Sequence, residues 1–233
     1  MKIFGTIIKR FLANFGLEIY KIGDTRNKWE NMPDDFALTI NSPLAINEWY
    51  SINKHIDDYL SKDRIIFYNE LISLTAKQGI IFKNTAILDA GCGSGALLNE
   101  LNKRYPGREL TVVDLSQTAI KYARKNMPDI LFEVKNIFKI TAEKKYDIIF
   151  CAEVLEHLLN PALALKKLSS LISNDGVLIL TVPDGRKDTY IGHINFWSPE
   201  NWPSFLNSQL PNYKIRTLIM ENNNTNLAFI AKK

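Results

Sequence analysis

Short apolar runs alternate with amphipathic stretches along most of the chain. The runs are rich in branched side chains and bounded by polar or turn residues, which is typical of buried strands in a parallel sheet. Between the runs, apolar residues recur at helical spacing. The strands predicted from this pattern are residues 86–88, 109–114, 130–135, 146–152 and 177–183. Strands that alternate with helices indicate an α/β fold built on a parallel sheet.

The end of the chain has a different pattern. Two apolar stretches, at about residues 213–220 and 226–231, flank the polar run of residues 221–225. A short polar turn between two such stretches predicts an antiparallel hairpin. The predicted fold class is therefore α/β: a seven-stranded, mostly parallel sheet with an antiparallel C-terminal hairpin and helices on both faces.

The first part of the chain reads as mainly helical. Residues 2–15 carry an apolar stripe with Lys and Arg among the polar positions, which fits a packing helix or a basic amphipathic helix on an anionic membrane surface. Packing is the interpretation that we favour. Residues 24–42 are polar and irregular, like a linker or a loop, and residues 44–78 are helical again. We expect residues 1–80 to form a helical extension and cap, and residues 81–233 to form the main domain.

Composition narrows the class of protein. A chain of 233 residues can hold one α/β domain with an appended segment. The net charge of +4 permits an anionic partner, but no dense basic patch or stacking motif points to nucleic acid. The two cysteines have neither metal nor disulfide spacing, and no apolar run reaches membrane-spanning length. We therefore expect a cytoplasmic protein.

A glycine-rich stretch follows the first predicted strand. Asp89 is followed by Gly91, Gly93 and Gly95, and leucines then recur at helical spacing. Glycine permits a positive φ and a close approach of backbone to ligand, and a helix N-terminus offers unpaired N–H groups. With Ala96, the first two glycines also satisfy the dinucleotide fingerprint G-x-G-x-x-G/A. Both a nicotinamide cofactor and another nucleoside ligand are therefore open at this point.

The acid and the three alternate glycines resemble motif I of the class I S-adenosylmethionine-dependent methyltransferases, D-x-G-x-G-x-G. The resemblance covers roughly residues 85–233 and implies a Rossmann-like sheet. The ligand carries an ammonium and a sulfonium, which a carboxylate at the strand end can face. The antiparallel hairpin favours this family, because nicotinamide-binding sheets normally stay parallel. In this stretch the resemblance implies five cofactor-binding residues: Asp89, Gly91, Cys92, Gly93 and Gly95.

A second acid, Asp114, ends the second predicted strand. A carboxylate there can accept both ribose hydroxyls of an adenosine ligand. The resemblance implies that Leu115 packs beside the adenine. It also implies that Asn136, standing where the family usually has Asp, accepts from the adenine amino group, with Ile137 next to it. On the preceding helical segment, Tyr50 and His55 could approach the ligand, although helix packing is the interpretation that we favour for both.

A run of acids and a histidine follows the fourth predicted strand. Glu153, Glu156 and His157 are spaced i, i+3 and i+4, so a helix would place them on one face. His193, on the long segment after the fifth strand, could join them. This resembles magnesium-dependent O-methyltransferases of the ubiquinone pathway and of plant small-RNA ends, which implies that all four residues hold Mg²⁺. In the metal-free alternative, Glu153 contacts substrate or cofactor and His157 or His193 is the catalytic base.

The sequence therefore predicts an S-adenosylmethionine-dependent methyltransferase that acts on a hydroxyl of a small molecule or glycan. Transfer would be an in-line displacement, for which the enzyme aligns the partners and removes a proton. The candidate catalytic residues are Glu153, His157 and His193. Two alternatives stay open: a nicotinamide-dependent oxidoreductase, and an inactive module that binds S-adenosylmethionine.

Overall fold

The computed structural model describes residues 41–82, 85–222 and 224–233. The predictions for residues 2–15, and for nearly all of 24–42, lie outside these residues. The described residues belong to one compact unit, Ile40–Lys233. No helix in this part of the chain is both long and apolar enough to cross a membrane.

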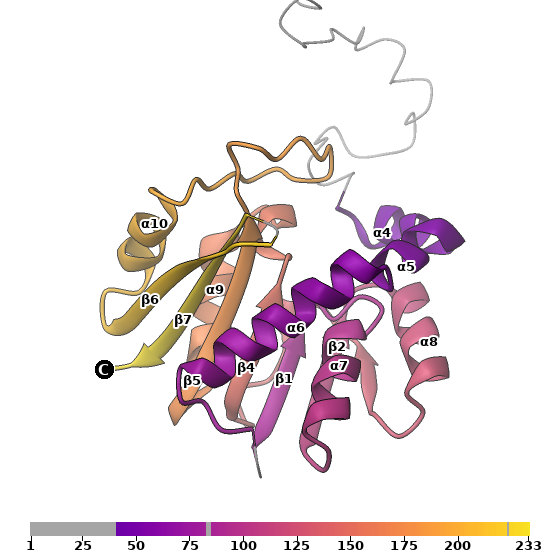
Figure 1. The fold of residues 1–233 in the computed structure, drawn as a ribbon, viewed down its shortest axis with the longest axis horizontal. Helices are drawn as coiled ribbons and strands as arrows, with labels where there is room; N and C mark the ends of the chain where they lie inside the picture. Colours follow the sequence, from indigo (N-terminus) through magenta and orange to yellow (C-terminus); the bar gives the residue numbers. More distant parts are fainter. Residues whose placement is uncertain (1–40, 83–84, 223) are drawn as a thin grey trace, which may run out of the picture. The chain divides into compact units, whose positions relative to one another are not determined.

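Seven strands form one sheet in the order β3-β2-β1-β4-β5-β7-β6 (Figure 1). Their bounds are β1 Ala86–Ala90, β2 Glu109–Asp114, β3 Phe132–Val134, β4 Tyr146–Ala152, β5 Ile172–Pro183, β6 Tyr213–Met220 and β7 Thr225–Lys232. The pairs among β1 to β5 are parallel, whereas β7 is antiparallel to both β5 and β6. The predicted fold class is confirmed. In such a sheet the carboxyl ends of β1, β2, β4 and β5 meet at one edge, where open α/β sheets bind ligands.

Helices cover both faces of the sheet. They are α4 Pro43–Ser51, α5 Asn53–Tyr59, α6 Lys62–Lys77, α7 Ala96–Arg104, α8 Gln117–Asn126, α9 Pro161–Ser170 and α10 Trp202–Gln209, with 3₁₀ turns η1 Ile137–Lys139 and η2 Leu155–His157. One apolar core lies between the sheet and α6 to α8, and a second lies between the sheet and α9 and α10. In Figure 1, α6 crosses the near face and α9 lies behind the sheet.

Side-chain caps fix where several of these helices begin. Ser42, Ser61 and Ser116 each accept a hydrogen bond from the backbone three residues on, and Asn160 does the same before Pro161. Each cap satisfies one of the backbone donors that a helix start leaves without a partner. The single helical stretch expected over residues 44–78 is therefore three helices, with breaks at Ile52 and at Leu60–Ser61.

The helices α4 to α6 lie in the same compact unit as the sheet. On α6, Leu71 and Ile72 are fully buried in the core that this helix shares with α7. The structure thus groups these helices with the sheet, and a domain boundary near residue 80 stays a prediction. Burial of α6 makes it part of the core rather than a detachable cap.

Two predicted strands have different bounds in the structure. The strand at 130–135 is shorter, because only Phe132–Val134 pairs with β2. The fifth strand begins earlier, at Ile172 instead of residue 177, and includes Asp175-Gly176. The register shifts there, since Tyr146 pairs with Ile172 but Ile148 pairs with Val177. Gly176 permits the irregularity, because a Cβ would lie 2.7 Å from the Tyr146 carbonyl oxygen.

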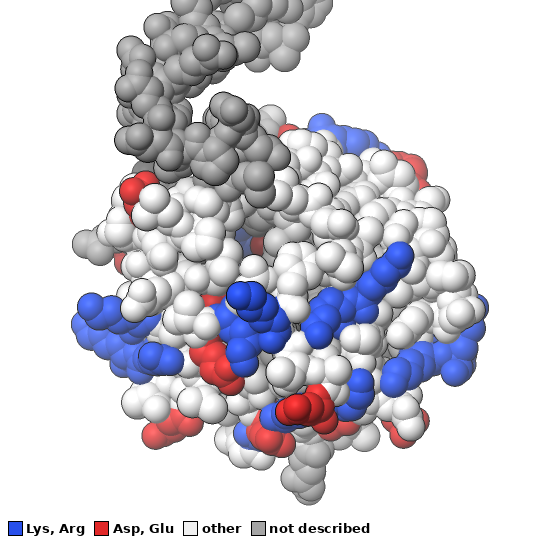
Figure 2. Space-filling model, turned by 180° about the vertical axis from the view of Figure 1, so that it is seen from behind, with Lys and Arg blue, Asp and Glu red and all other residues white. Residues whose placement is uncertain are grey.

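Charge is mixed on the surface opposite the view of Figure 1. Figure 2 shows Lys and Arg side chains on that face as separate groups, with acidic side chains and uncharged surface between them. A continuous positive surface would be expected of a protein that tracks nucleic acid. This face has the mixed character that the modest net charge of +4 predicts.

Candidate active site

The turn between β1 and α7 is made by three glycines in the left-handed region. Gly91, Gly93 and Gly95 have φ values of 90°, 52° and 77°. An added Cβ would lie 2.4 Å from Val154, 2.7 Å from the Tyr50 hydroxyl and 2.5 Å from Met127, respectively. The prediction that this turn needs glycine is thus explained partly by protein packing and not only by ligand approach.

Asp89 is a buried carboxylate at the end of β1. It is 2% exposed, and among the described residues its Oδ2 has no hydrogen-bond partner. Burial, and then the charge of Asp114, raise the pKa of Asp89 to about 8. A buried carboxylate is costly without a donor, so the position suits a cationic or hydrogen-bonding ligand group.

Asp114 lies at the end of β2, opposite the glycine turn. Its Oδ2 accepts from the Gly93 N–H at 2.8 Å and its Oδ1 from the Ser116 N–H at 2.7 Å. Burial raises the pKa of this carboxyl, and the backbone donors oppose the shift. Asp114 therefore holds the turn and the start of α8 in place. Because each carboxylate oxygen has two lone pairs, it can accept further hydrogen bonds.

Tyr50 on α4 reaches the glycine turn. Its hydroxyl lies over Gly93, and its ring stacks on Tyr59 of α5 with centroids 5.7 Å apart. Burial raises the pKa of Tyr50 well above its usual value, so the neutral phenol is a hydrogen-bond donor. His55, by contrast, stacks on Trp49 and bonds to its carbonyl oxygen. Of these two residues, only Tyr50 is brought to the turn.

The remaining predicted cofactor residues line the neighbouring strand ends. Cys92 is buried within the turn, and burial raises the pKa of its thiol. Leu115 is half-buried after β2, and Ile137 is buried in η1. The Oδ1 of Asn136 accepts from the Phe138 N–H at 2.9 Å, capping η1. That oxygen has a structural partner, so its predicted adenine contact would have to use the second lone pair.

Glu153 does not lie on a helix with Glu156 and His157. Its φ is +58°, a strained value for a residue with a Cβ, and η2 begins only at Leu155. The helical face that was predicted to carry Glu153, Glu156 and His157 is therefore not formed. Glu153 points instead to Arg64, with 3.9 Å between Oε2 and the guanidinium, and its buried Oε1 has no partner in the described part of the chain. Strain of this kind is concentrated at functional sites.

Glu156, His157 and His193 come together as the sequence predicted. One ligand atom from each lies within 4.8 Å of the others. Glu156 is fully buried, and neither of its carboxylate oxygens has a hydrogen-bond partner among the described residues. Burial, and then the charge of Glu153, raise the pKa of Glu156 well above its usual range. The predicted ligand set thus loses Glu153 and keeps the other three residues.

Both histidines of this group, which we call the Glu–His–His cluster, are held by a hydrogen bond at the same ring nitrogen, Nδ1. His157 Nδ1 lies 3.0 Å from the Gly192 carbonyl oxygen, which can only accept, so Nδ1 carries the proton. His193 Nδ1 is hydrogen-bonded to Asp188, and its Nε2 lies 3.8 Å from Glu156 Oε1. Burial, and then His193, lower the pKa of His157 to about 4. Each Nε2 is therefore a free acceptor, as in a metal ligand or a general base.

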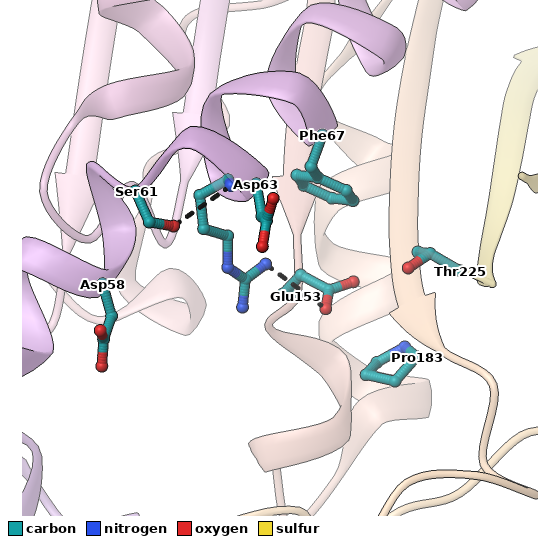
Figure 3. A pocket seen from close by; sticks show the side chains of 8 residues that line it. Asp58, Ser61, Asp63, Phe67, Glu153, Pro183 and Thr225 are labelled. Carbon is teal, nitrogen blue, oxygen red and sulfur yellow. Dashed lines mark hydrogen bonds and ion pairs between the residues drawn. The ribbon is translucent and has the colours of Figure 1, made fainter. Parts of the chain in front are cut away.

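A cavity of about 450 Å³ opens beside Glu153 (Figure 3). It lies between the segment that starts α6 and the ends of β4, β5 and β7. It is lined by Asp58, Ser61, Asp63, Arg64, Phe67, Glu153, Pro183 and Thr225. The glycine turn, the cluster and this cavity thus occupy the same carboxyl edge of the sheet, as expected for a two-substrate enzyme.

Sequence reasoning missed several residues of this site. Arg64 and Asp58 lie at ordinary polar positions of helices, and Asp188 lies in an irregular loop. None belongs to a motif, so no local signal could have found them. The fold brings them to the site through tertiary contacts, such as the hydrogen bonds from Ile194 and Asn195 to the Glu156 carbonyl, which fix the loop on η2.

Known proteins share this sequence pattern. A family model described as "Methyltransferase domain" matches residues 81–227, more than half of the chain. The chain belongs to this family. It is 26% identical to the ubiquinone biosynthesis O-methyltransferase of Rickettsia canadensis over 194 residues, covering 79% of this chain and 72% of the relative. It is 28% identical to the malonyl-[acyl-carrier protein] O-methyltransferase of Bacillus cereus over 115 residues, covering 48% of this chain and 43% of the relative.

Solved structures agree on the fold of this methyltransferase. NodS of Bradyrhizobium japonicum, an N-methyltransferase in complex with S-adenosyl-L-homocysteine, matches with a TM-score of 0.64 at 16% identity, covering 82% of this chain and 98% of NodS. The plantazolicin methyltransferase BpumL, also in complex with S-adenosyl-L-homocysteine, matches with a TM-score of 0.63 at 17% identity, covering 84% of this chain and 98% of BpumL. The protein is a class I S-adenosylmethionine-dependent methyltransferase.

Proposed function

We propose that this methyltransferase transfers the methyl group of S-adenosylmethionine to a hydroxyl oxygen of a small molecule or glycan. The observation that carries the choice of oxygen is the pair of histidines, each held by Nδ1, that come together with buried Glu156. A hydroxyl must lose a proton as it attacks, and a neutral imidazole can accept one. O-methylation also agrees with the two relatives described above, both of which are O-methyltransferases.

The residues of the glycine turn fit the methyl donor. In this proposal Asp89 faces the ammonium group of the donor, because its buried Oδ2 has no other partner among the described residues. Asp114 accepts from the ribose hydroxyls, while the backbone at Gly91, Cys92, Gly93 and Gly95 approaches the ligand without intervening side chains. Leu115, Asn136 and Ile137 lie beside the base. Glu153, between the turn and the cavity, contacts donor or acceptor.

The acceptor's proton is handled by the Glu–His–His cluster. Asp188 holds the His193 ring by Nδ1, and the Gly192 carbonyl holds the His157 ring in the same way. Either Nε2 can then accept the proton while the opposite ring nitrogen stays hydrogen-bonded. His193, whose partner is a carboxylate, is the better base, because Asp188 stabilises the imidazolium that forms.

The same cluster fits a divalent cation. Glu156, His157 and His193 supply one oxygen and two nitrogens, each histidine with its second nitrogen fixed by an acceptor. Two nitrogen ligands favour Mn²⁺ or Zn²⁺ over the Mg²⁺ suggested by the sequence resemblance, because Mg²⁺ prefers oxygen. Such an ion would lower the pKa of a bound hydroxyl.

Ligand-induced thermal stabilisation tests the donor. S-adenosyl-L-homocysteine should raise the melting temperature, because a ligand that binds only the folded state stabilises it by mass action, whereas NAD should not. Equal stabilisation by NAD would favour the nicotinamide alternative. Binding without any methyl transfer would favour the inactive module.

Chelation distinguishes a cluster that holds a metal ion from a metal-free cluster in which a histidine is the base. With a metal, EDTA should abolish methyl transfer, Mn²⁺ should restore it, and S-adenosyl-L-homocysteine binding should survive both treatments. Without one, EDTA should have no effect and His193→Ala should lower kcat by about 10²–10⁴-fold. His55→Ala is the matched control, since His55 stacks on Trp49 and is not one of the three residues of the cluster. Activity indifferent to EDTA, His157→Ala and His193→Ala would contradict both versions.

A further inference from the structure

The cavity beside Glu153 has a polar lining. Of its eight lining residues, only Phe67 and Pro183 are apolar (Figure 3). Sites for flat or prenylated aromatic molecules are lined predominantly by hydrophobic and aromatic side chains. The volume of about 450 Å³ is within the range of small-molecule sites, so this cavity differs from the sites for aromatic molecules in the chemistry of its lining and not in its size. The lining selects a ligand that is itself rich in hydrogen-bonding groups.

The charges of the lining are unequal. Asp58, Asp63 and Glu153 contribute three carboxylates, and Arg64 contributes the one cation of the lining. The guanidinium lies 5.6 Å from the ring centroids of both Tyr59 and Phe67, and its contact with Glu153 is long, at 3.9 Å. Arg64 therefore has N–H donors to spare on the cavity side. The excess of carboxylates opposes a ligand that carries negative charge.

Glu153 connects the cavity to the chemistry. Its strained backbone directs the side chain into the lining, where Oε1 lacks a partner among the described residues. The next turn, η2, carries Glu156 and His157 of the Glu–His–His cluster. Glu153 is therefore the lining residue that connects the cavity, along the chain, to the groups that would remove a proton. The cavity belongs to the acceptor, whereas the glycine turn belongs to the methyl donor.

We propose that the acceptor bound in this cavity is a carbohydrate ring without negative charge, neutral or amino-substituted. Sugar hydroxyls donate to Asp58, Asp63 and Glu153 and accept from Arg64, so each lining charge finds a complementary group. The proposal rests on the proposed function. It differs from what the names of the Rickettsia relatives would suggest, because a ubiquinone precursor is a prenylated aromatic molecule and only Phe67 and Pro183 of this lining are apolar residues.

The test compares acceptors on one enzyme preparation. Methyl glycosides of glucose, mannose and galactose, of glucosamine and of glucuronic acid are offered with S-adenosylmethionine and Mn²⁺, beside catechol and 3,4-dihydroxybenzoate. Formation of S-adenosyl-L-homocysteine reports turnover. Saturation-transfer NMR on protein saturated with S-adenosyl-L-homocysteine reports acceptor binding. We expect the neutral and amino glycosides to bind and be methylated, and the glucuronide to be at least about tenfold poorer in kcat/KM because of the carboxylates.

Variants locate the effect in the cavity. Asp58→Asn and Asp63→Asn should each reduce the difference in kcat/KM between the neutral glycosides and the glucuronide. Arg64→Gln should raise KM more than it lowers kcat. Asp57→Asn is the matched control, because Asp57 is the exposed neighbour of Asp58 and does not line the cavity. Asp57→Asn should leave kcat and KM unchanged.

Each contrary result would contradict a specific part of the argument. Methylation of the catechols with no binding of any glycoside would overturn the carbohydrate proposal and leave the proposed function intact. A preference for the glucuronide would overturn the charge argument, and so would selectivity unchanged in both Asp variants. No binding of any glycoside in the NMR experiment would overturn the proposal even if no acceptor were methylated. Failure of S-adenosyl-L-homocysteine to bind would instead contradict the proposed function itself.

Discussion

Asp89 and Asp114 are both buried beside the glycine turn, but their surroundings differ. Asp114 has two backbone donors, whereas Oδ2 of Asp89 has no partner in the described part of the chain. The fold itself already stabilises the Asp114 carboxylate, whereas the Asp89 carboxylate is stabilised only when a ligand binds. We therefore expect the two residues to contribute differently to ligand binding.

The pKa of Asp89 predicts a pH-dependent affinity. In the free protein this pKa is about 8, so the carboxyl is mostly protonated at pH 7. The ligand ammonium favours the charged form and lowers the pKa, so binding below pH 8 should release close to one proton. The affinity for S-adenosyl-L-homocysteine should therefore rise from pH 6 to pH 8, by at most about tenfold per pH unit. Calorimetry in two buffers of different ionisation enthalpy measures the released proton.

Asp89→Asn is the control for this effect. It cannot ionise, so the variant should bind more weakly at pH 8 and show little proton release. Proton release equal to that of the natural protein would assign the titration to another group. Affinity that falls between pH 6 and pH 8 would contradict the direction of the linkage.

Asp114 should affect affinity through hydrogen bonds. Asp114→Ala removes the acceptor for the ribose hydroxyls and weakens the hold on Gly93 and Ser116. We expect a loss of about 1.5–3 kcal/mol, or roughly 10–150-fold in Kd for S-adenosyl-L-homocysteine. Exposed Asp129→Ala is the matched control and should leave Kd unchanged. Unchanged affinity in Asp114→Ala would mean that the ribose is held elsewhere.

For individual site residues, the sequence predicted those that belong to motifs and missed those that do not. Asp89, Asp114 and the glycines follow strands at recognisable spacing, and the structure places them at the expected strand ends. Arg64 reaches the cavity from a helix far earlier in the chain, and Asp188 reaches His193 from a loop. Such positions depend on tertiary packing, which no local pattern encodes.

Gly95, in the turn from β1 to α7, has a matched control in Gly107, between α7 and β2. Gly95 has a φ of 77°, and a Cβ there would lie 2.5 Å from Met127 and 3.2 Å from Phe132. Gly107 has a φ of 81° with nothing within 4 Å. Alanine at Gly107 meets only the left-handed backbone strain, about 1 kcal/mol, whereas alanine at Gly95 adds overpacking of about 1–3 kcal/mol.

Chemical denaturation measures the difference. Gly95→Ala should lower the free energy of unfolding by more than Gly107→Ala, and the difference between the two variants isolates the steric contribution of the turn. Equal losses would show that Met127 moves aside without cost. The side chain of methionine is flexible, so a difference near the lower end of the range is expected.

Among the elements, the strands were predicted better than the connections. The stretches 109–114, 146–152 and 213–220 are strands with the expected bounds, because their apolar runs pair along their whole length. After β4, the i, i+3, i+4 spacing suggested a helix, but the left-handed Glu153 and the 3₁₀ turn η2 stand there instead. The Glu156 carbonyl accepts from the loop at Ile194 and Asn195, so a tertiary contact decided the local conformation.

From residue 41 on, the described part of the chain is one sheet between two apolar cores, and the first of these cores includes α6. Phe67, Leu71 and Ile72 of this helix are almost completely buried. Removing a large apolar side chain from a core costs about 2–5 kcal/mol, whereas a whole domain is stable by only about 5–15 kcal/mol. The family match begins at residue 81, yet the burial of α6 indicates that the folding unit begins earlier.

Two fragments test where that unit begins. A fragment of residues 81–233 lacks α6 and exposes the core face of α7, so it should lack a cooperative thermal transition and bind a hydrophobic dye. A fragment of residues 40–233 keeps α4 to α6 and should unfold cooperatively and bind S-adenosyl-L-homocysteine, measured by calorimetry. Cooperative unfolding of the shorter fragment would support the boundary near residue 80 that the sequence suggested. Even a folded short fragment should lose acceptor selectivity, because five of the eight lining residues of the cavity, Arg64 among them, would be missing.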